Sequence, residues 1–333
     1  MPNPNNRKYD VVGIGSALLD ITLHVDDSFL KKLGLRKGEM MLIDEHQLEK
    51  ILSDIKSIKA KKSSGGSAAN TMIGVSRLGG KAMFIGMVGD DANGKSYNEL
   101  LAKSGVTPLL SKGDKMTGSA ITFVTPDSER SFATYLGAAS SLSEEDIDED
   151  NIIQAKILHI EGYMMDLQNL REAALKAMRI AKKAGMKISL DLSDPGVVRR
   201  NHDLLHSIVN DYADIVFANE NEAKEYAGLE EEQALDKISS MCEVAVVKLG
   251  EKGSLIKKDG KTYRIPIQKV SVANTNGAGD AYAAGVLYSI AHNIPLEKAG
   301  KIAAYISAQV VASHEATVSR DLADEVKKML SAR

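Results

Sequence analysis

The segment NTNGAGDAYAAG, residues 274–285, places a glycine-rich turn directly before a helical run that continues to Ile290. The first N–H groups of a helix have no partner within it, and the helix dipole adds partial positive charge at the same end. Because glycine leaves these groups unshielded, residues 277–279 form a candidate anion site that suits a phosphate group. Asp280, at the start of the helix, could take a proton from a hydroxyl group that attacks this phosphate. On spacing alone, a tight turn in which Asp280 only favours the helix N-terminus fits equally well.

Outside this segment, short apolar runs of strand length alternate with amphipathic stretches of helix length. Residues 167–184, for example, repeat apolar side chains at spacings of three and four, as one buried helix face requires. Such alternation predicts an α/β fold: a three-layer α/β/α arrangement with a mostly parallel central sheet, whose ligand site lies beyond the carboxyl ends of the strands. The runs that we interpret as buried strands are residues 9–15, 82–88, 157–160, 187–190, 215–217 and 244–249.

Two regions depart from this alternation. Residues 21–43 and 106–136 carry short alternating runs separated by turn residues, and neither shows a helical partner nearby. We expect them to form a small β-rich lid beside the main sheet. From Gly277 to Leu330 the pattern is almost entirely helical. Since no internal repeat or low-complexity linker divides the chain, we predict one domain, residues 8–333, that carries the lid.

The composition limits the class of function. Hydrophobic residues make up 44% of the 333 residues and the formal net charge is −3, which argues against nucleic acid or an anionic membrane as a partner. The single cysteine, Cys242, excludes an internal disulfide and a cysteine-only metal site. Residues 1–10 are polar, and no run of about 18 apolar residues occurs. We therefore expect a soluble, cytoplasmic enzyme that acts on a small molecule, as a monomer or a homodimer.

Residues 274–285 resemble the DTNGAGD-type signature of the ribokinase-like (PfkB) kinases. Five further blocks of that family occur in the same order, and the resemblance covers roughly residues 9–312. These blocks are GIGSALLD at 13–20, GGSAAN at 65–70, the glycine-bearing segment 88–106, NENE at 219–222 and KLGEKG at 248–253. The resemblance implies a ribokinase-like fold and an ATP-dependent kinase that phosphorylates a hydroxymethyl group on a sugar or a nucleoside.

The resemblance also implies roles for particular residues. Asp280 is the expected catalytic base, and contacts to the transferred phosphoryl group fall on Asn276, Gly277, Ala278, Gly279 and the lid residue Arg130. ATP contacts fall on Asn219, Glu222, Lys248, Gly250 and Gly253. Glu222 is expected to act on Mg²⁺ largely through water, and family members often respond to a monovalent cation such as K⁺, which the residues do not test. Substrate contacts fall on Ser16, Leu18, Asp20, Met40, Leu42, Gly65, Gly66, Asn70, Phe132, Leu136, Tyr163 and Met164.

The acceptor stays open between two classes. The blocks DLSDP at 191–195 and DIVFANE at 214–220 resemble the adenosine kinase branch, and the mostly apolar pocket residues suit a base. The sequence departs from the family pattern at three positions: Ser16 stands where the nucleoside branch usually has asparagine, Asn274 replaces an aspartate, and Glu315 lies where glycine is expected near the adenine of ATP. The first departure loosens the case for adenosine, and because of the third we assign no contacts to the adenine of ATP. We expect an adenosine-like nucleoside, with fructose, ribose or ketodeoxygluconate as the alternative.

Two other functions compete with such a kinase. Residues 89–96, GDDANGKS, satisfy the P-loop pattern GxxxxGK[ST] between a strand and a helix. The two adjacent aspartates would bring negative charge to the bound phosphates, which disfavours this interpretation. A P-loop nucleotidase or ATPase should depend on Lys95, whereas the ribokinase-like kinase should not. The second alternative is a non-catalytic sugar-binding regulator, and the intact 277–279 loop with Asp280 argues against it.

Overall fold

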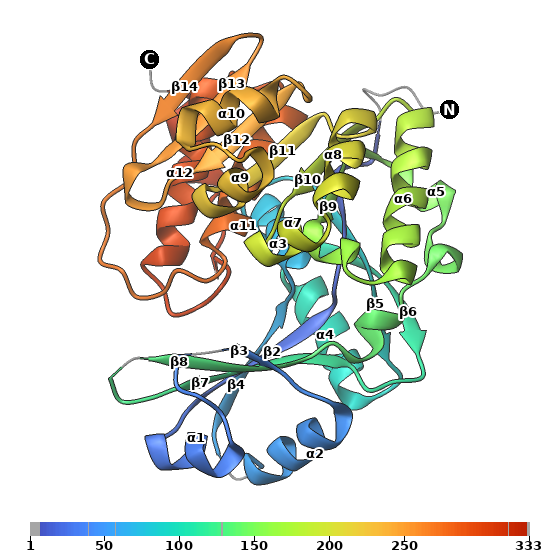
Figure 1. The fold of residues 1–333 in the computed structure, drawn as a ribbon, viewed down its shortest axis with the longest axis vertical. Helices are drawn as coiled ribbons and strands as arrows, with labels where there is room; N and C mark the ends of the chain where they lie inside the picture. Colours follow the sequence, from blue (N-terminus) through green and yellow to red (C-terminus); the bar gives the residue numbers. More distant parts are fainter. Residues whose placement is uncertain (1–6, 39, 57, 128, 319, 332–333) are drawn as a thin grey trace.

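The computed structural model describes residues 7–38, 40–56, 58–127, 129–318 and 320–331. The remaining residues, which include parts of the expected N-terminal segment, domain end and lid, lie outside this description. Within the described ranges, a nine-stranded sheet forms the middle layer (Figure 1), in the order β14-β13-β12-β11-β10-β9-β1-β5-β6. In this spatial order, all neighbouring strands between β12 and β6 pair in parallel, and β13 and β14 extend the sheet antiparallel at the β12 edge. The strands are β1 (Tyr9–Ile14), β5 (Ala82–Gly89), β6 (Val106–Gly113), β9 (Ala155–Glu161), β10 (Lys187–Asp191), β11 (Ile215–Asn219), β12 (Val244–Lys248), β13 (Ser254–Lys258) and β14 (Lys261–Ile265).

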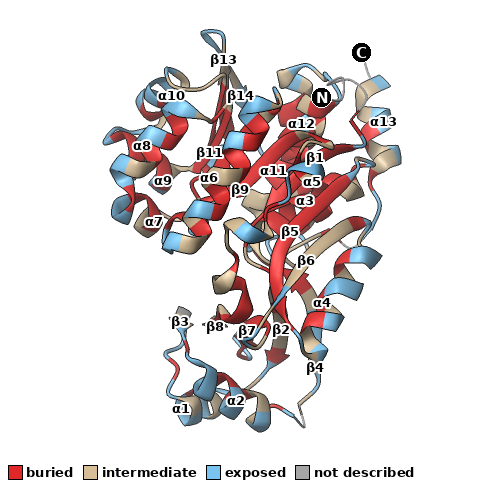
Figure 2. Cartoon of the chain, turned by 90° about the vertical axis from the view of Figure 1, so that its right-hand side faces the viewer, coloured by how far each residue is buried: buried red, intermediate tan, exposed pale blue. Residues whose placement is uncertain are grey.

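Helices cover both faces of this sheet because consecutive strand residues point to opposite sides. In β9, Leu158 belongs to the core beneath α6, whereas Ile157 belongs to the core beneath α3 and α11. Strands such as β1 and β5 are therefore buried along their whole length (Figure 2). The first face carries α5 (Glu149–Ile152), α6 (Gln168–Lys183), α7 (Pro195–Arg200), α8 (His202–Asp211), α9 (Glu220–Ala227) and α10 (Glu231–Ser239). The second carries α3 (Ser67–Arg77), α4 (Ala92–Lys103), α11 (Ala278–Ala291) and α12 (Leu296–Val311), with α13 (Ala323–Ser331) against α12.

A second sheet, five-stranded over the same described ranges, lies below the first in Figure 1. Its outer face is covered by α1 (Asp27–Leu33) and α2 (Glu45–Asp54), and Leu19, Ile21 and Leu23 point into the core they share. The alternate residues of the same strand line a cavity on the inner face. In sheet order, the strands are β3 (Met40–Leu42), β8 (Arg130–Tyr135), β7 (Gly118–Val124), β2 (Leu18–His24) and β4 (Ala60–Gly65).

The predicted three-layer α/β fold with a smaller second sheet is confirmed, but the boundaries expected for the lid differ. Residues 106–113 form β6 of the main sheet, since each of them pairs with β5. Residues 60–65 form β4 of the small sheet, although the sequence AKKSSG shows no apolar alternation. The range 21–43 contains α1, and α2 follows it, where no helical partner was expected. Over the described residues, no helix combines the length and the hydropathy needed to cross a bilayer.

Small residues bring α3, α11 and α12 close together on one face of the main sheet. A Cβ atom on Gly74 of α3 would lie 2.5 Å from the Cβ of Ala284 in α11. On the other side of α11, a Cβ on Gly285 would lie 2.4 Å from the Cα of Ala303 in α12. Carbon atoms pack at about 3.5–4.0 Å, so these glycines set the spacing of the helices. The close contact places the start of α3 beside the start of α11.

Exchanging the two small residues at the α3–α11 contact tests this packing. Gly74→Ala should lower the free energy of unfolding by about 1–3 kcal/mol, because the new methyl group overlaps that of Ala284. Adding Ala284→Gly removes the overlap, so the double variant should return to within about 1 kcal/mol of the wild type. Urea unfolding followed by circular dichroism measures all variants. Strictly additive losses would show that the two residues do not set the helix spacing.

Candidate active site

A cavity of about 1720 Å³ opens between the carboxyl-end edge of the main sheet and the inner face of the small sheet. Parallel α/β sheets place their ligand sites at this edge. Both sheets contribute to its wall: Leu18, Asp20 and Thr22 from β2, and Asp191, Asn219 and Lys248 from the ends of β10, β11 and β12. The cavity therefore brings together segments from most of the chain.

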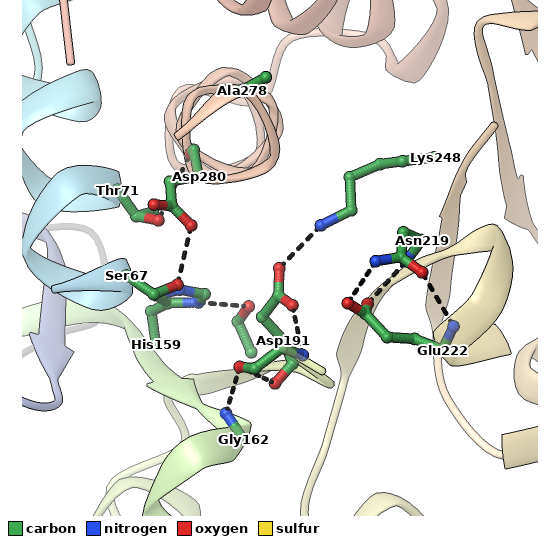
Figure 3. Close-up of polar contacts among 12 residues, drawn as sticks. Ser67, Thr71, His159, Gly162, Asp191, Asn219, Glu222, Lys248, Ala278 and Asp280 are labelled. Atoms are coloured by element: carbon green, nitrogen blue, oxygen red, sulfur yellow. Dashed lines mark hydrogen bonds and ion pairs between the residues drawn. The ribbon is translucent and has the colours of Figure 1, made fainter. Parts of the chain in front are cut away.

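Asp280, the third residue of α11, is held by two side chains of α3. Its carboxylate accepts hydrogen bonds from Ser67 Oγ at 2.8 Å and from Asn70 Nδ2 at 3.0 Å, and Figure 3 shows the bond from Ser67. Burial raises the pKa of Asp280 to about 6, and these two hydrogen bonds oppose the rise. A carboxylate whose pKa lies near the working pH is suited to act as a general base.

The turn before α11 leaves backbone donors available next to Asp280. Gly277 has a φ of 76°, and a Cβ there would lie 1.8 Å from the carbonyl oxygen of Ala316, so the position requires glycine. Among the described residues, none accepts a hydrogen bond from the N–H of Gly279 or of Asp280. These donors lie at the positive end of the helix dipole and suit an anion. The ammonium group of Lys248 lies close by, since its Nζ would be 3.2 Å from a Cβ on Gly279.

Lys248 is the cation on the main-sheet side of this turn. It forms an ion pair of 3.0 Å with Asp191 (Figure 3). Burial lowers the pKa of Lys248, but the charges of Asp191 and Glu222 outweigh burial, so its pKa is raised and the side chain remains charged. Beside the pair, the N–H and Nδ2 of Asn219 donate to the carboxylate of Glu222 in a capping box at the start of α9. Burial raises the pKa of Glu222 to about 7.

Asp20 provides a second carboxylate on the small-sheet side. Burial, followed by the charge of Asp280, raises the pKa of Asp20 to about 7. No hydrogen bond within the described residues engages its carboxylate, so both oxygens remain open to the cavity. Gly65 on the paired strand β4 makes room for it, since a Cβ there would lie 2.3 Å from the carboxylate. An open carboxylate of this kind is a strong acceptor for hydroxyl donors.

The rest of the wall mixes apolar and polar groups. Leu18 and Phe132 of the small sheet present apolar surface, and Tyr163, in the turn after β9 of the main sheet, adds a ring that is 44% exposed. Arg130, at the start of β8, is half-buried, and burial lowers its pKa. Within the described part of the chain, no carboxylate pairs with its guanidinium group. Arg130 is thus available to an anionic ligand.

Most residues predicted for the site line this one cavity. The residues predicted for the phosphoryl group and for the nucleotide all do so: Arg130, Asn219, Glu222, Lys248, Gly250, Gly253, Asn276, Gly277, Ala278, Gly279 and Asp280. Of the predicted substrate contacts, the lining includes Leu18, Asp20, Gly66, Asn70, Phe132 and Tyr163.

Three predicted substrate contacts lie elsewhere. Met164 is 1% exposed and packs into the core beneath α6, because the short 3₁₀ turn Gly162–Met165 directs it inward. Leu42 is 62% exposed on the edge strand β3, outside the cavity lining. Leu136 follows β8 at the connection back to the main sheet, where its carbonyl oxygen approaches Gly118. The side chain of Met40 lies outside the described residues.

Two further predicted contacts, Ser16 and Gly65, support the site from behind its wall. The N–H of Ser16 donates to the carboxylate of Glu161, and Gly65 makes room for Asp20. Sequence reasoning assigned no role to Ser67, Glu161 or Asp191. The sequence did point to Glu161 and Asp191, because each is a carboxylate at the end of a buried strand, at the sheet edge where ligand sites form.

The P-loop pattern at 89–96 does not form a nucleotide site. Asp91 caps α4, and its carboxylate accepts hydrogen bonds from the N–H of Gly94 at 2.7 Å and from the N–H and Oγ1 of Thr117 at 2.8 and 2.6 Å. None of these eight motif residues lines the cavity. The protein's own carboxylate thus engages the N–H of Gly94, a group that a P-loop would offer to phosphate.

Comparison with known proteins agrees with this geometry. Residues 38–322 match the pfkB family carbohydrate kinase domain. The chain is 29% identical to 5-dehydro-2-deoxygluconokinase from Clostridium perfringens, over 97% of this chain and 93% of that protein. The protein of the same name from Bacillus subtilis is 30% identical, over 81% of this chain and 87% of its own length.

Two solved structures share the fold along nearly the whole chain. The adenosine kinase from Sinorhizobium meliloti is 35% identical with a TM-score of 0.86, covering 96% of this chain and 99% of its own. A probable sugar kinase from Rhizobium etli is 34% identical with a TM-score of 0.87, covering 97% and 98%. Given the family match over most of its length, together with a carboxylate set beside free helix N–H groups in one cavity, the chain belongs to the pfkB family of carbohydrate kinases.

Proposed function

We propose that this protein transfers the γ-phosphoryl group of ATP to a hydroxymethyl group of a sugar or a sugar acid. The placement of Asp280 carries the proposal, because one carboxylate lies beside the N–H groups suited to phosphate and in the same cavity as the open carboxylate of Asp20. A sugar-type acceptor is favoured by the carbohydrate kinase domain and by relatives named 5-dehydro-2-deoxygluconokinase. The adenosine-like acceptor expected from the sequence is therefore the second candidate.

Each group of the cavity has a defined task in this reaction. Asp20 binds two vicinal hydroxyls of the acceptor and turns the hydroxymethyl group toward Asp280. Asp280 takes the hydroxyl proton as the oxygen attacks the γ-phosphorus, and ADP leaves. The N–H groups of Gly279 and Asp280, with the ammonium of Lys248, stabilise the charge on the phosphoryl group in transit. Arg130 adds a cation from the small-sheet side.

Glu222 would hold a nucleotide-bound magnesium ion through water and not as a direct ligand. Mg²⁺ supplies charge neutralisation of the phosphates during transfer. Both carboxylate oxygens of Glu222 already accept hydrogen bonds from Asn219, and the described residues contain no cluster of three side chains suited to a metal ion. We therefore assign Glu222 an indirect role through water, as Mg²⁺ commonly keeps several waters. Gly250 and Gly253, at the turn after β12, line the wall beside Lys248 where the nucleotide would lie.

We also propose that the small sheet acts as a lid over the acceptor. The cavity lies between the two sheets, so a change in their separation opens or closes it. Closure would exclude water, which otherwise competes with the acceptor for the phosphoryl group. Lys61 of β4 already pairs with Glu315 from the loop after α12, and both residues line the cavity.

Adenosine remains the second candidate because of one specific similarity. The adenosine kinase from Sinorhizobium meliloti is 35% identical over 96% of this chain. Leu18, Phe132 and Tyr163 supply apolar surface that could hold a base. Against this stand the polar side chains of the same wall, among them Thr22, Ser63 and Arg130, which suit a hydroxyl-rich or anionic acceptor better.

A screen of acceptors decides between the two. ADP formation should be measured with 5-dehydro-2-deoxygluconate, ketodeoxygluconate, fructose, ribose, adenosine, inosine and cytidine. We expect the highest kcat/KM for a sugar or sugar acid, because Asp20 and Arg130 recognise hydroxyl and anionic groups. The Lys95→Ala variant is the control against a P-loop enzyme and should match the wild type. Adenosine as the best acceptor would overturn the sugar assignment, and activity with none of these would overturn the acceptor class.

Asp280→Asn keeps the shape of the side chain but removes its basicity. We expect turnover to fall by about two to four orders of magnitude, the contribution typical of a general base. ATP binding, measured by calorimetry, should change little. If the variant keeps more than about a tenth of wild-type turnover with chemistry rate-limiting, another group is the base.

The pH dependence of kcat/KM should report the ionisation of Asp20 and Asp280. Asp20 binds the acceptor hydroxyls and Asp280 takes the proton in their ionised forms, so activity should decline as the pH falls through about 7 and about 6. The hydrogen bond from Ser67 favours the ionised form, so Ser67→Ala should raise the pKa of Asp280 and move the acidic limb to higher pH. Ser76→Ala, on the same helix without a contact to Asp280, is the control. A limb that stays in place or moves to lower pH in Ser67→Ala would contradict the assignment.

A further inference from the structure

One buried carboxylate joins two of the connections between the sheets. Glu161, at the end of β9, is 1% exposed. Its Oε1 accepts the N–H of Ser16 and its Oε2 accepts the N–H of Ala68, both at 2.8 Å. Ser16 lies in the connection from β1 of the main sheet to β2 of the small sheet. Ala68 lies just beyond the connection by which β4 returns to α3.

Glycines hold these connections close to Glu161 and to each other. A Cβ on Gly15 would lie 2.4 Å from Oε2 of Glu161. Gly66 has a φ of 99°, and a Cβ there would lie 2.0 Å from the carbonyl oxygen of Ser16. Both distances are far below van der Waals contact. The two connections therefore cross in direct contact, with the carboxylate of Glu161 bonded to both.

Each connection leads directly to a group of the candidate site. The chain that passes Ser16 continues along β2 to Asp20. The first turn of α3, which includes Ala68, carries Ser67 and Asn70, the two donors to the carboxylate of Asp280. Glu161 itself does not line the cavity. Glu161 therefore acts on the reaction without touching the acceptor, through these neighbours and through its charge on Asp280.

We propose that Glu161 is a positioning residue for phosphoryl transfer. It ties the start of α3, whose side chains orient Asp280, to the segment that leads into the strand carrying Asp20. The proposal rests on the role of Asp280 as the base. With its two oxygens bound to backbone N–H groups of different segments, Glu161 keeps the start of β2, which leads to Asp20, next to the start of α3, which orients Asp280. Charge-assisted bonds to backbone N–H groups are strong enough for this task.

A second carboxylate provides a matched comparison. The connection from β6 to β7 is held by Asp91, which accepts the N–H and Oγ1 of Thr117. The connection after β8 contacts the same β6–β7 connection, because the N–H of Ala138 donates to the carbonyl oxygen of Met116 at 2.8 Å. Asp91 makes no hydrogen bond to α3 within the described residues. Removing its charge should loosen the lid without disturbing the donors of Asp280.

Amide hydrogen exchange on the free protein tests the contact itself. Glu161→Gln has one oxygen and one NH₂ group, so the backbone N–H that faces the NH₂ loses its acceptor. We expect faster exchange in residues 15–18 or 66–70, with the strands of the main sheet unchanged. Asp91→Asn should instead accelerate exchange at 114–118. Unchanged exchange at both 15–18 and 66–70 in Glu161→Gln would overturn the proposal, whether or not the protein is a kinase.

A double-mutant cycle on turnover tests the path to Asp280. Glu161→Gln should lower kcat by about 10- to 100-fold, the effect of a lost charge-assisted bond, with little change in KM for ATP. If Glu161 acts through α3, the losses of turnover in Glu161→Gln and Ser67→Ala, expressed as free energies, should not add in the double variant. The corresponding losses in Asp91→Asn and Ser67→Ala should add. Additive losses in both cycles, or an unchanged kcat in Glu161→Gln, would overturn the positioning role.

Glu161→Asp keeps the test decisive if the glutamine variant is poorly folded. Aspartate retains the charge and both acceptor oxygens, so its kcat should exceed that of Glu161→Gln, or of Glu161→Ala where the glutamine variant cannot be measured. A kcat no higher than that of the uncharged variant would overturn the role of the carboxylate. If the proposed function is wrong, the wild-type protein will phosphorylate none of the acceptors. The hydrogen-exchange experiment on Glu161→Gln does not depend on that activity and can still be interpreted.

Discussion

A carboxylate can remain ionised inside a protein only where donors or cations stand beside it, and Asp280 receives its two donors from a different helix. Ser67 and Asn70 lie in the first turn of α3, whereas Asp280 lies in the first turn of α11. The two helix starts meet because Gly74 allows α3 to approach Ala284 closely. The main sheet beneath both helices then brings the ends of β9, β10 and β12 to the same edge. The donors of the candidate base follow from this helix contact, and the main sheet brings Lys248 to the same edge.

The charge around the cavity explains why the site needs cations. The pKa values of Asp20, Glu161 and Glu222 are raised to about 7, mainly by burial, and that of Asp280 to about 6. One pKa unit corresponds to about 1.4 kcal/mol of interaction, so further negative charge from phosphates would favour protonation of these groups. Lys248 and the dipole of α11 counter that charge, and a magnesium ion bound to the nucleotide would add to them. Arg130 adds positive charge from the small sheet.

Two departures from the family pattern turn out to be neighbours. Nδ2 of Asn274 donates to the carbonyl oxygen of Glu315 at 3.3 Å, and its Oδ1 accepts the N–H of Asn276 at 3.0 Å. An aspartate at position 274 could accept the second bond but could not donate the first. The amide therefore ties the turn before α11 to the loop after α12. The side chain of Glu315 continues the link to Lys61 on the small sheet, although that pair is exposed and contributes little to stability.

Local patterns predicted the layered fold, and the resemblance to the kinase family singled out the turn before α11 and Asp280, because each of these signals lies within a short stretch of sequence. The same patterns failed for β4, whose sequence AKKSSG gains its strand conformation by pairing with β2, and for residues 106–113, which pair with β5. The two aspartates at 90 and 91 already argued against a P-loop, but the sequence did not show the helix cap made by Asp91, since Thr117, which completes that cap, lies 26 positions away. The donors of Asp280 and the contacts of Glu161 join residues separated by 93 to 213 positions. Only the tertiary structure decided these hydrogen bonds. Each requires a donor and an acceptor to lie close together in space, and the packing of the helices on the sheet brings them there.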